Sequence, residues 1–466
     1  MPSTIGMKKT TKKQIKGILM LILIVAIGFL LIYSVSNYPI QNGNISFGGH
    51  LRTELFYLIV FFLIALLILL FITLLSLRIS KKKKPTVIIQ SDKSEVCDSQ
   101  PEEKEDSPER FCMLSEIDKK SNTYGHRIYN KGVTLKSFCE DFRNYAASQL
   151  SLYYDIEDIR RFVAGLAVSK LVILQGMSGT GKTSLAHAFG SFVDNPSTVI
   201  PVQPMWKERT DLIGYYNEFT KRFNESQLLI KMYEANYSRD VYITILDEMN
   251  IARVEYYFAE FLSLLELPNA NERYIDVVSD KWETDPKQFA DGRIKLPENM
   301  WFIGTANNDD STFAISDKVY DRAMVLNLDM KSERFAAPKT PKGIISADQF
   351  KELADSALKE YGVSRRNLSR LEELDKYLIE HFHITFGNRI MKQIKSYIPV
   401  YVSCGGRELD ALDDILAKKV IRKLETQNPI YLRNSSEGLI SFIDELFGDD
   451  NMSICKDLIH RLQRNA

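Results

Sequence analysis

Two long apolar runs lie near the amino end of the chain, at residues 18–33 and 55–77. Neither run contains a charged residue, and each is close to the ~20 residues that cross the hydrocarbon core of a bilayer. Because a backbone in lipid must satisfy its own hydrogen bonds, both runs are expected to be helices. We therefore predict a hairpin of two transmembrane helices, at residues 15–35 and 53–78.

Two other interpretations of these runs fit less well. A cleaved signal peptide has a shorter apolar region followed by a small-residue cleavage site, and the first run shows no such site. A helix in a protein core carries a polar stripe, which the second run lacks. The transmembrane interpretation is therefore preferred.

Positive charge is distributed unevenly around the two runs. Five lysines lie between residues 8 and 16, and five lysines or arginines lie at 78–84, whereas the connecting loop at 36–52 carries only Arg52. Loops rich in lysine and arginine stay in the cytoplasm, so residues 1–14 are predicted to be a basic cytoplasmic arm and the loop to be extracytoplasmic. The chain is thus expected to be a multi-pass protein of the cell membrane, in contact with the lipid bilayer, with both termini in the cytoplasm.

Residues 79–133 are predicted to form a flexible linker that is first basic and then acidic. Its segment from Ser91 to Arg110 has eight acids, three bases and almost no apolar residue. Such a segment buries too little surface to offset the entropy lost on ordering.

From residue 134 onward, short apolar runs alternate with helix-like blocks. An amphipathic block at 253–267 is typical of a helix. The strand-like runs lie at 171–175, 198–202, 241–246 and 300–305. Strands that alternate with helices indicate a three-layer α/β sandwich with a mainly parallel sheet. We place this core, with a leading helix, at residues 134–335.

Apolar positions recur at helical spacing in the last part of the chain. The four blocks lie at 348–361, 367–381, 387–398 and 409–425. We therefore predict that residues 336–466 form a separate all-α lid with further carboxyl-terminal helices.

The composition narrows the possible functions. Lys+Arg and Asp+Glu both number 60, which gives a formal net charge of zero, and 45% of residues are hydrophobic. These values exclude a generally basic nucleic-acid coat and a mostly disordered chain. The five cysteines form no CxxC pair, so neither a disulfide framework nor a zinc site is expected.

A glycine-rich segment follows the first predicted strand and precedes a helix. It reads Gly176, Met177, Ser178, Gly179, Thr180, Gly181, Lys182 and Thr183, which matches the pattern GxxxxGK[ST]. Glycines let the backbone curl so that successive amides face an anion, and the helix N-terminus adds its positive dipole end. We expect Lys182 to reach the β- and γ-phosphates of a nucleotide and Thr183 to coordinate Mg²⁺.

Two carboxylates end the strand-like run at 241–246. In an open α/β sheet, ligands gather at the carboxyl ends of the strands. Asp247 is therefore predicted to hold the Mg²⁺ shell, and Glu248 to orient or deprotonate the attacking water. The alternative is that Asp247 and Glu248 are solvent-exposed loop residues without a role. The phosphate loop upstream argues against this alternative.

These motifs together resemble the AAA+ ATPases, and more narrowly the dynein-related branch with the MoxR proteins and the GTP-dependent McrB restriction motors. The resemblance covers roughly residues 150 to 400. It rests on GMSGTGKT at 176–183, ILDEMNIARVEYYFAEFLSLLE at 245–266 and WFIGTANNDDSTFAISDKVYDRA at 301–323. It implies a P-loop NTPase core of AAA+ type with an all-α lid, preceded here by the predicted membrane hairpin.

The resemblance also implies roles for three polar residues. Asn307 falls where the family places sensor 1, which responds to the γ-phosphate and helps to position water. Arg322 matches the arginine finger, which projects into the site of the neighbouring subunit, and Arg389 resembles sensor 2. The alternatives are a strand-end turn residue for Asn307, a surface salt bridge for Arg322 and a capping or surface arginine for Arg389.

The resemblance implies that the chain binds ATP with Mg²⁺, although no motif decides between ATP and GTP. It also implies a homo-oligomeric ring, expected to be a hexamer. The leading prediction is a membrane-anchored ATPase that remodels or activates an unidentified client protein. One alternative is a DNA-directed defence motor with an McrC-like nuclease partner, although the membrane hairpin takes the place of that family's DNA-reading domain. Another is a nucleotide-gated membrane scaffold with little turnover.

Overall fold

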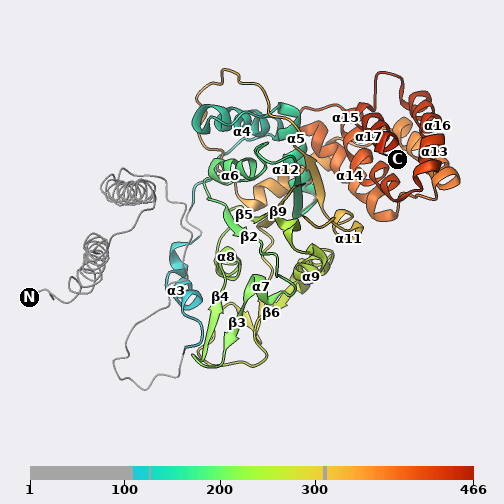
Figure 1. Cartoon of the computed structure of the whole chain (residues 1–466). Coiled ribbons are helices and arrows are strands. Elements are labelled where there is room, and N and C mark those ends of the chain that lie inside the picture. Colours follow the sequence, from blue (N-terminus) through green and yellow to red (C-terminus); the bar gives the residue numbers. More distant parts are fainter. Residues whose placement is uncertain (1–108, 125–126, 308–311, 466) are drawn as a thin grey trace, which may run out of the picture. The chain divides into compact units, whose positions relative to one another are not determined.

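A computed structural model describes residues 109–124, 127–307 and 312–465 (Figure 1). The chain divides into two compact units, residues 1–96 and 97–466, and all described residues belong to the second unit. The predicted arm, both predicted spans, the loop between them and the linker up to residue 108 lie outside the described residues. Within the described ranges, no helix is both long enough and apolar enough to cross a membrane.

A five-stranded parallel sheet forms the centre of this unit, in the order β10-β1-β9-β5-β2. Its strands are β1 (Leu171–Gly176), β2 (Thr198–Pro201), β5 (Tyr242–Asp247), β9 (Met300–Asn307) and β10 (Met324–Asn327). The inner strands are nearly continuous apolar runs because helices cover both of their faces. The predicted α/β fold with a parallel sheet is confirmed, and β10 is an additional strand at the edge.

Alternate residues of β1 enter two different hydrophobic clusters, as the period of a strand requires. Val172 and Leu174 pack with α4 (Leu135–Leu150), α5 (Ile156–Val168) and α6 (Lys182–Phe192). Leu171 and Ile173 pack on the other face, with α8 (Gln227–Ala235), α9 (Val254–Tyr257) and α10 (Ala259–Leu264). The sheet is therefore the middle layer of three, as predicted.

The single helix predicted at 253–267 is instead two short helices, α9 and α10. The break lies at Phe258, whose backbone leaves the helical region at φ −107° and ψ 8°. Its ring stacks on Phe261 at 4.8 Å and meets Phe302 of β9 edge-on at 5.2 Å. Packing against the sheet therefore overrides the helical pattern of this segment.

The start of the described chain differs from the predicted flexible linker. Arg110 and Phe111 are buried, and α3 (Met113–Lys119) packs on α8. The Glu225 carboxylate accepts hydrogen bonds of 2.9–3.0 Å from the backbone amides of residues 112, 113 and 114 at the start of α3. Arg110 donates from Nε to Asp285 at 2.7 Å. The linker prediction therefore extends too far, because an acid-rich stretch leads directly into a helix with one buried face.

Two antiparallel additions to the core have no counterpart in the prediction. After α7 (Thr210–Ile213), strands β3 (Gly214–Asn217) and β4 (Arg222–Glu225) form a hairpin. A three-stranded sheet follows α10, with β8 (Arg293–Lys295) between β6 (Tyr274–Asp276) and β7 (Phe289–Ala290). All five strands have four residues or fewer, which is too short for a period-two pattern to stand out.

The carboxyl-terminal part of the chain is helical, as predicted. It contains α12 (Ala347–Glu360), α13 (Arg365–Phe382), α14 (Asn388–Ser403), α15 (Glu408–Lys419), the 3₁₀ helix η4 (Ile421–Thr426), α16 (Pro429–Phe447) and α17 (Ser453–Asn465). Helix α14 packs against α5 of the core. Lys419 reaches the turn after α11 (Asp317–Tyr320) and donates to the carbonyls of Tyr320 and Ala323.

Gly304 in the middle of β9 makes room for Met249, which follows Glu248. A Cβ on Gly304 would lie 1.9 Å from the Met249 sulfur. Overpacking of a core costs about 1–3 kcal/mol, so Gly304→Ala is expected to lower the urea midpoint of the chain. Gly362→Ala is the matched control, since nothing lies within 4 Å of its added Cβ. Adding Met249→Ala should restore part of the loss, and strictly additive losses would contradict this account.

Candidate nucleotide-binding site

The loop between β1 and α6 is curled at its glycines. Gly176, Gly179 and Gly181 have φ angles of +144°, +79° and +99°. These values lie where side chains other than glycine are strained. A Cβ on Gly176 would also lie 2.3 Å from the Leu328 carbonyl oxygen, so the loop packs closely against the chain after β10. The result is a cradle whose amides precede the N-terminus of α6.

The loop lysine is buried and folded back over this cradle. Lys182 is 6% exposed, and its Nζ donates to the carbonyls of Gly176 at 2.9 Å and Met177 at 2.7 Å. A buried ammonium that binds backbone carbonyls is positioned to exchange them for phosphate oxygens. Tyr154, which sequence reasoning missed, donates from its hydroxyl to the Gly181 carbonyl at 3.1 Å. Burial raises the pKa of Tyr154, which keeps this hydroxyl a donor.

Asp247 joins the loop to the sheet. Its Oδ1 accepts a hydrogen bond of 2.9 Å from the Thr183 hydroxyl and another of 2.8 Å from the Thr305 hydroxyl. Thr305 in turn accepts from the Glu248 amide at 2.9 Å. The structure therefore brings together Thr183 and Asp247, the two residues predicted to hold a metal. Thr305 is a third member of the site, which its position inside a buried strand concealed.

The donor set around Asp247 suits a hard cation. A threonine hydroxyl and a carboxylate offer oxygen ligands, and Mg²⁺ is bound in proteins by one or two such groups together with water and substrate phosphates. Among the described residues, no cluster of three or more His, Cys, Asp or Glu side chains is arranged to hold a metal ion. The Thr183–Asp247 pair therefore fits Mg²⁺ that arrives with a nucleotide.

Glu248 has an unusual backbone for a residue other than glycine. It lies in the left-handed region, with φ +53° and ψ +46°, and it is exposed directly after β5. Such a conformation costs about 1–3 kcal/mol and persists only where the surroundings impose it. Here the Glu248 amide is held by Thr305 and its carbonyl by the Ile251 amide at 2.9 Å. The strand end thus presents a carboxylate to solvent beside Asp247.

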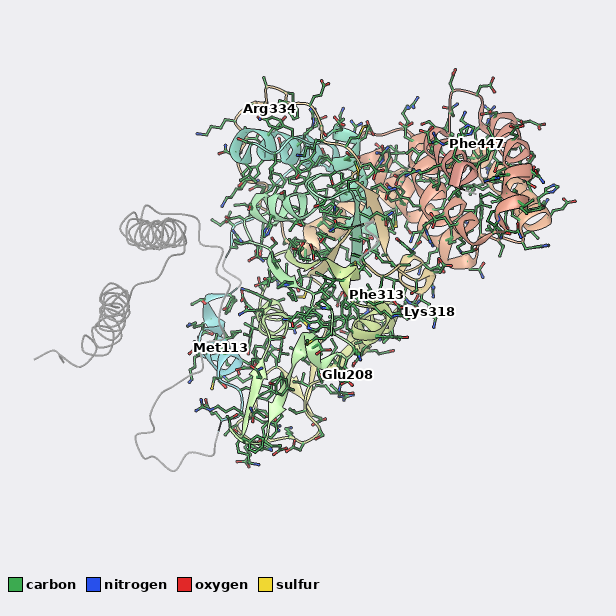
Figure 2. The ribbon with its side chains drawn as sticks, viewed as in Figure 1. Met113, Glu208, Phe313, Lys318, Arg334 and Phe447 are labelled. Carbon is green, nitrogen blue, oxygen red and sulfur yellow. The ribbon has the colours of Figure 1, made fainter. Side chains whose placement is uncertain are left out.

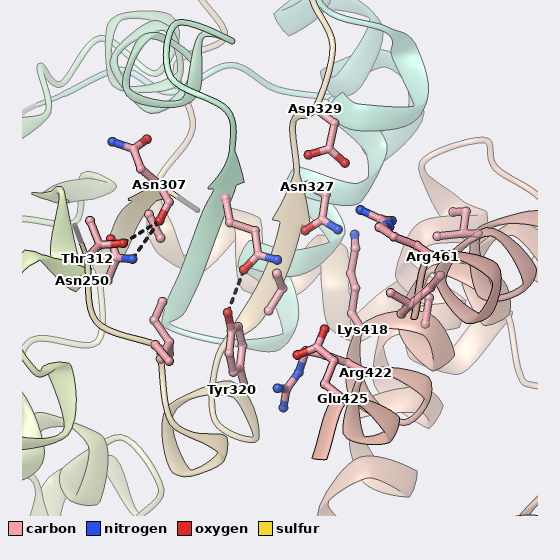
Figure 3. Close-up of a pocket in the computed structure, with 18 of the residues that line it drawn as sticks. Asn250, Asn307, Thr312, Tyr320, Asn327, Asp329, Lys418, Arg422, Glu425 and Arg461 are labelled. Carbon is pink, nitrogen blue, oxygen red and sulfur yellow. Dashed lines mark hydrogen bonds between the residues drawn. The ribbon is translucent and has the colours of Figure 1, made fainter. Parts of the chain in front are cut away.

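Asn307 ends β9 and lies opposite Gly176 in the register with β1. Its backbone carbonyl accepts from the Asn250 side-chain amide at 2.9 Å and from the Thr312 hydroxyl at 3.1 Å (Figure 3). Figure 3 shows the Asn307 side chain pointing away from these bonds. Asn250 is buried and was also missed, although it follows Glu248 by only two residues. The predicted sensor 1 residue is thus fixed next to the phosphate loop.

A cavity of about 470 Å³ lies beside this site, within the size range of small-molecule pockets. One wall is formed by residues at the strand ends and the other by residues of the helical region (Figure 3). The polar strand-end residues are Gln175, Asn307, Asn327 and Asp329, and the cationic helical residues are Lys418, Arg422 and Arg461. The helical region therefore places three cationic side chains and one carboxylate, that of Glu425, next to the carboxyl ends of β1, β9 and β10.

Arg322 and Arg389 meet at one carboxylate. Arg322 Nη2 lies 2.7 Å from Glu266 Oε2, and Arg389 Nη2 lies 2.5 Å from Glu266 Oε1. Arg322 also donates from Nη1 to the carbonyl of Lys318 at 2.8 Å. Lys318 belongs to α11 and is labelled in Figure 2. Neither arginine has a partner in the phosphate loop of its own chain. The structure therefore groups the predicted finger and the predicted sensor 2, through a glutamate that sequence reasoning missed.

The order of the loop, the carboxylates and the strand-end asparagine is matched by a known family. Residues 171–323 match the AAA domain of the dynein-related subfamily. This segment is an AAA domain. Residues 340–466 match a domain of unknown function, DUF8727, which covers the helical region. A search of curated proteins found no match to the chain.

Solved structures give weaker likenesses. A candidate ATPase from Cytophaga hutchinsonii is 14% identical, with a TM-score of 0.44, over 71% of this chain and 97% of that one. A full-length MCM homologue from Methanopyrus kandleri is 10% identical, with a TM-score of 0.34, over 60% and 58%. NtrX from Brucella abortus is 14% identical, with a TM-score of 0.26, over 71% and 72%. At these scores the likenesses add nothing to the argument from the site.

Thr305→Val removes the hydroxyl that joins Asp247 to the Glu248 amide while keeping the shape of the side chain. Turnover at saturating ATP is expected to fall by about tenfold, or roughly 1.4 kcal/mol, the scale of one net hydrogen bond. The check is steady-state phosphate release. Thr305→Ser keeps the hydroxyl and is the matched control, so equal losses in the two variants would contradict the assigned role.

Proposed function

We propose that the AAA domain of this chain binds and hydrolyses ATP with Mg²⁺ in a ring oligomer, in which Glu248 and Arg322 take part in hydrolysis. The turnover is coupled to remodelling or activation of a partner protein. The observation that carries the proposal is the 2.9 Å bond between Thr183 and Asp247. It joins the phosphate loop to the carboxylate strand across 64 residues of sequence, and these are the two parts that a nucleotide site needs at one point.

The residues of the loop bind and orient the triphosphate. Its amides and the N-terminus of α6 face the anion, and the Lys182 ammonium supplies a full positive charge. Thr183 and Asp247 would hold Mg²⁺, which when bound neutralises phosphate charge. This arrangement needs no side chain specific for a base, so ATP is proposed and GTP stays an alternative.

Glu248 is the proposed group that orients or deprotonates the attacking water. Its carboxylate is exposed beside Asp247, and the bond between its amide and Thr305 fixes its position. Asn307, on the adjacent strand and opposite Gly176, is proposed to position the same water or to contact the γ-phosphate. Both roles require only groups already held at the strand ends.

The ring is proposed because Arg322 and Arg389 are engaged away from their own loop. Glu266 holds both guanidinium groups, 2.7 and 2.5 Å away, and both side chains stay partly exposed. A guanidinium presented at the surface by a carboxylate can stabilise phosphate charge on a neighbouring chain. We propose that Arg322 acts as this finger and that Arg389 accompanies it.

The proposed location is the cell membrane, with the AAA domain in the cytoplasm. Its support is the sequence alone: the uncharged runs within 15–35 and 53–78 and the basic residues that flank them. Anchoring of this kind would direct the output of the ring to partners at or near the bilayer.

Glu248→Gln is expected to keep ATP affinity within about threefold and to lower hydrolysis by about a hundredfold or more, since the amide cannot accept a proton. Binding is measured with a fluorescent ATP analogue and turnover by phosphate release. Glu283→Gln, at an exposed glutamate outside the site, is the control. Normal turnover in Glu248→Gln would refute its role.

Arg322→Ala is expected to lower turnover by about a thousandfold, the scale of a lost arginine finger. Adding Lys182→Ala chains should restore part of the activity, because each variant supplies the group that the other lacks. Chains that carry both substitutions are the control and should not restore activity. If single-variant Lys182→Ala chains also fail at every mixing ratio, the finger does not act between subunits.

A further inference from the structure

A second group of positive charges lies in the helical region, where α13 and α15 begin. A cavity of about 290 Å³ is bounded there by Ser364, Arg366, Asn367, Arg370, Arg407 and Glu408. This volume is at the lower end of ligand pockets, which run from roughly 300 to 1,000 Å³. The cavity is therefore large enough for a small anion or head group but small for a whole nucleotide.

The acids in and around this cavity are already engaged. Glu408 Oε1 accepts a hydrogen bond from the Ser364 amide at 2.8 Å. Asp410 accepts hydrogen bonds from Nε and Nη2 of Arg407, at 2.9 and 2.5 Å. Glu373 accepts from the Ser369 hydroxyl at 3.3 Å. No carboxylate of the described chain lies within ion-pair distance of Arg366 or Arg370. Two guanidinium groups therefore face the cavity without an ion pair, although the Glu373 carboxylate is close enough to raise the pKa of Arg370 and partly oppose the effects that lower it.

The arginines oppose the electrostatics of their own helix. The first turn of α13 contains Arg365 and Arg366 and no acid, although the N-terminus of a helix favours negative charge by about 0.3–1 kcal/mol per group. The first amides of α13 also lack partners within the helix. Burial, followed by the nearby Arg366, lowers the pKa of Arg370. An anion in the cavity would lower the unfavourable electrostatic energy of all these positive groups at once.

Asn367 is the residue that points to a ligand most directly. It is 5% exposed and lines the cavity. Its Oδ1 accepts from Arg370 Nη1 at 3.0 Å, and its backbone amide donates to the Ser364 hydroxyl at 3.3 Å. Its side-chain nitrogen has no acceptor among the described residues. This nitrogen is accessible at the cavity, where it can donate a hydrogen bond to an anionic ligand.

Arg370 is held in place by more than its bond to Asn367. Its guanidinium lies 5.4 Å from the ring centroid of Phe447, at the end of α16 in the helical region (Figure 2). A cation stacked on an aromatic ring loses little freedom when it binds a ligand, because its orientation is already fixed. The cavity thus has one pre-oriented guanidinium, that of Arg370, one exposed guanidinium, that of Arg366, and one amide donor, that of Asn367.

We infer that this cavity is a binding site for a phosphate group, separate from the loop at 176–183. Arg370 and Asn367 would bind its oxygens from the floor, Arg366 from the rim, and the first amides of α13 from the helix end. The ligand class is inorganic phosphate or a small phosphate monoester. Planar guanidinium groups match phosphate oxygens, and the volume of about 290 Å³ suits a group of this size.

The test titrates inorganic phosphate into the full-length chain carrying Lys182→Ala, so that the phosphate loop does not contribute. Calorimetry at constant ionic strength, with chloride as the balancing anion, should show one saturable site per chain. Arg366→Gln combined with Arg370→Gln should weaken binding by at least about tenfold. Arg365→Gln removes a charge from the same turn outside the cavity, and it should stay within about twofold.

Asn367→Asp places a carboxylate where the amide donor lies, with almost no change in size, and should abolish binding even if the double arginine variant fails to fold. Glycerol 3-phosphate is the second probe. Binding equal to that of phosphate indicates a monoester ligand, and binding of phosphate alone indicates the free anion. The inference is overturned if the Lys182→Ala chain binds no phosphate, or if Asn367→Asp and the arginine variant bind it unchanged.

Discussion

The carboxylate of Asp247 is the point on which the candidate site depends. One oxygen of this group accepts hydrogen bonds from Thr183 at the start of α6 and from Thr305 inside β9. Thr305 then fixes the Glu248 amide, so four residues from three segments are placed by one short network. Such a network can form only if β5 lies beside β9 and β9 beside β1, because the three carboxyl ends must meet at one edge. The strand order of the sheet is therefore the physical condition for the chemistry.

Glu266 links the helical region to the AAA domain. It binds Arg322 of the core and Arg389 of α14 at the same time, while Lys419 reaches the turn that carries Arg322. Burial lowers the pKa of Lys419 to about 7, so the charge of the amine that makes this contact changes near neutral pH. A movement of α14 or α15 would therefore displace Arg322, the proposed finger, through these contacts. If the proposed ring forms, these contacts would be a physical route by which the nucleotide state of one chain affects the next.

Much of the core and loop could be predicted from the sequence because local patterns specify them. The strands at 171–175, 241–246 and 300–305 are short but strongly apolar runs, and the loop needs glycine at fixed positions, which three glycines with positive φ supply. The four predicted helical blocks of the last part of the chain also appear as helices, since their apolar positions recur over several turns.

The rest depends on contacts between distant segments. Helix α3 was missed because its capping carboxylate, Glu225, lies more than 100 residues away. Strand β10 has four residues and gains its place by pairing with β1. The sharing of Glu266 by two arginines cannot be deduced from spacing, because it requires α10, α11 and α14 to be packed first. The roles assigned to the site residues, the ring and the membrane anchor stay predictions.

The loop at 176–183 is proposed to bind a nucleoside triphosphate through Lys182. The most direct measurement is calorimetric titration of the folded full-length chain with ATP and Mg²⁺, beside the Lys182→Ala variant. We expect one saturable site per chain in the unmodified protein and none in the variant. Absence of binding heat with both ATP and GTP, or equal affinity in the two proteins, would contradict it.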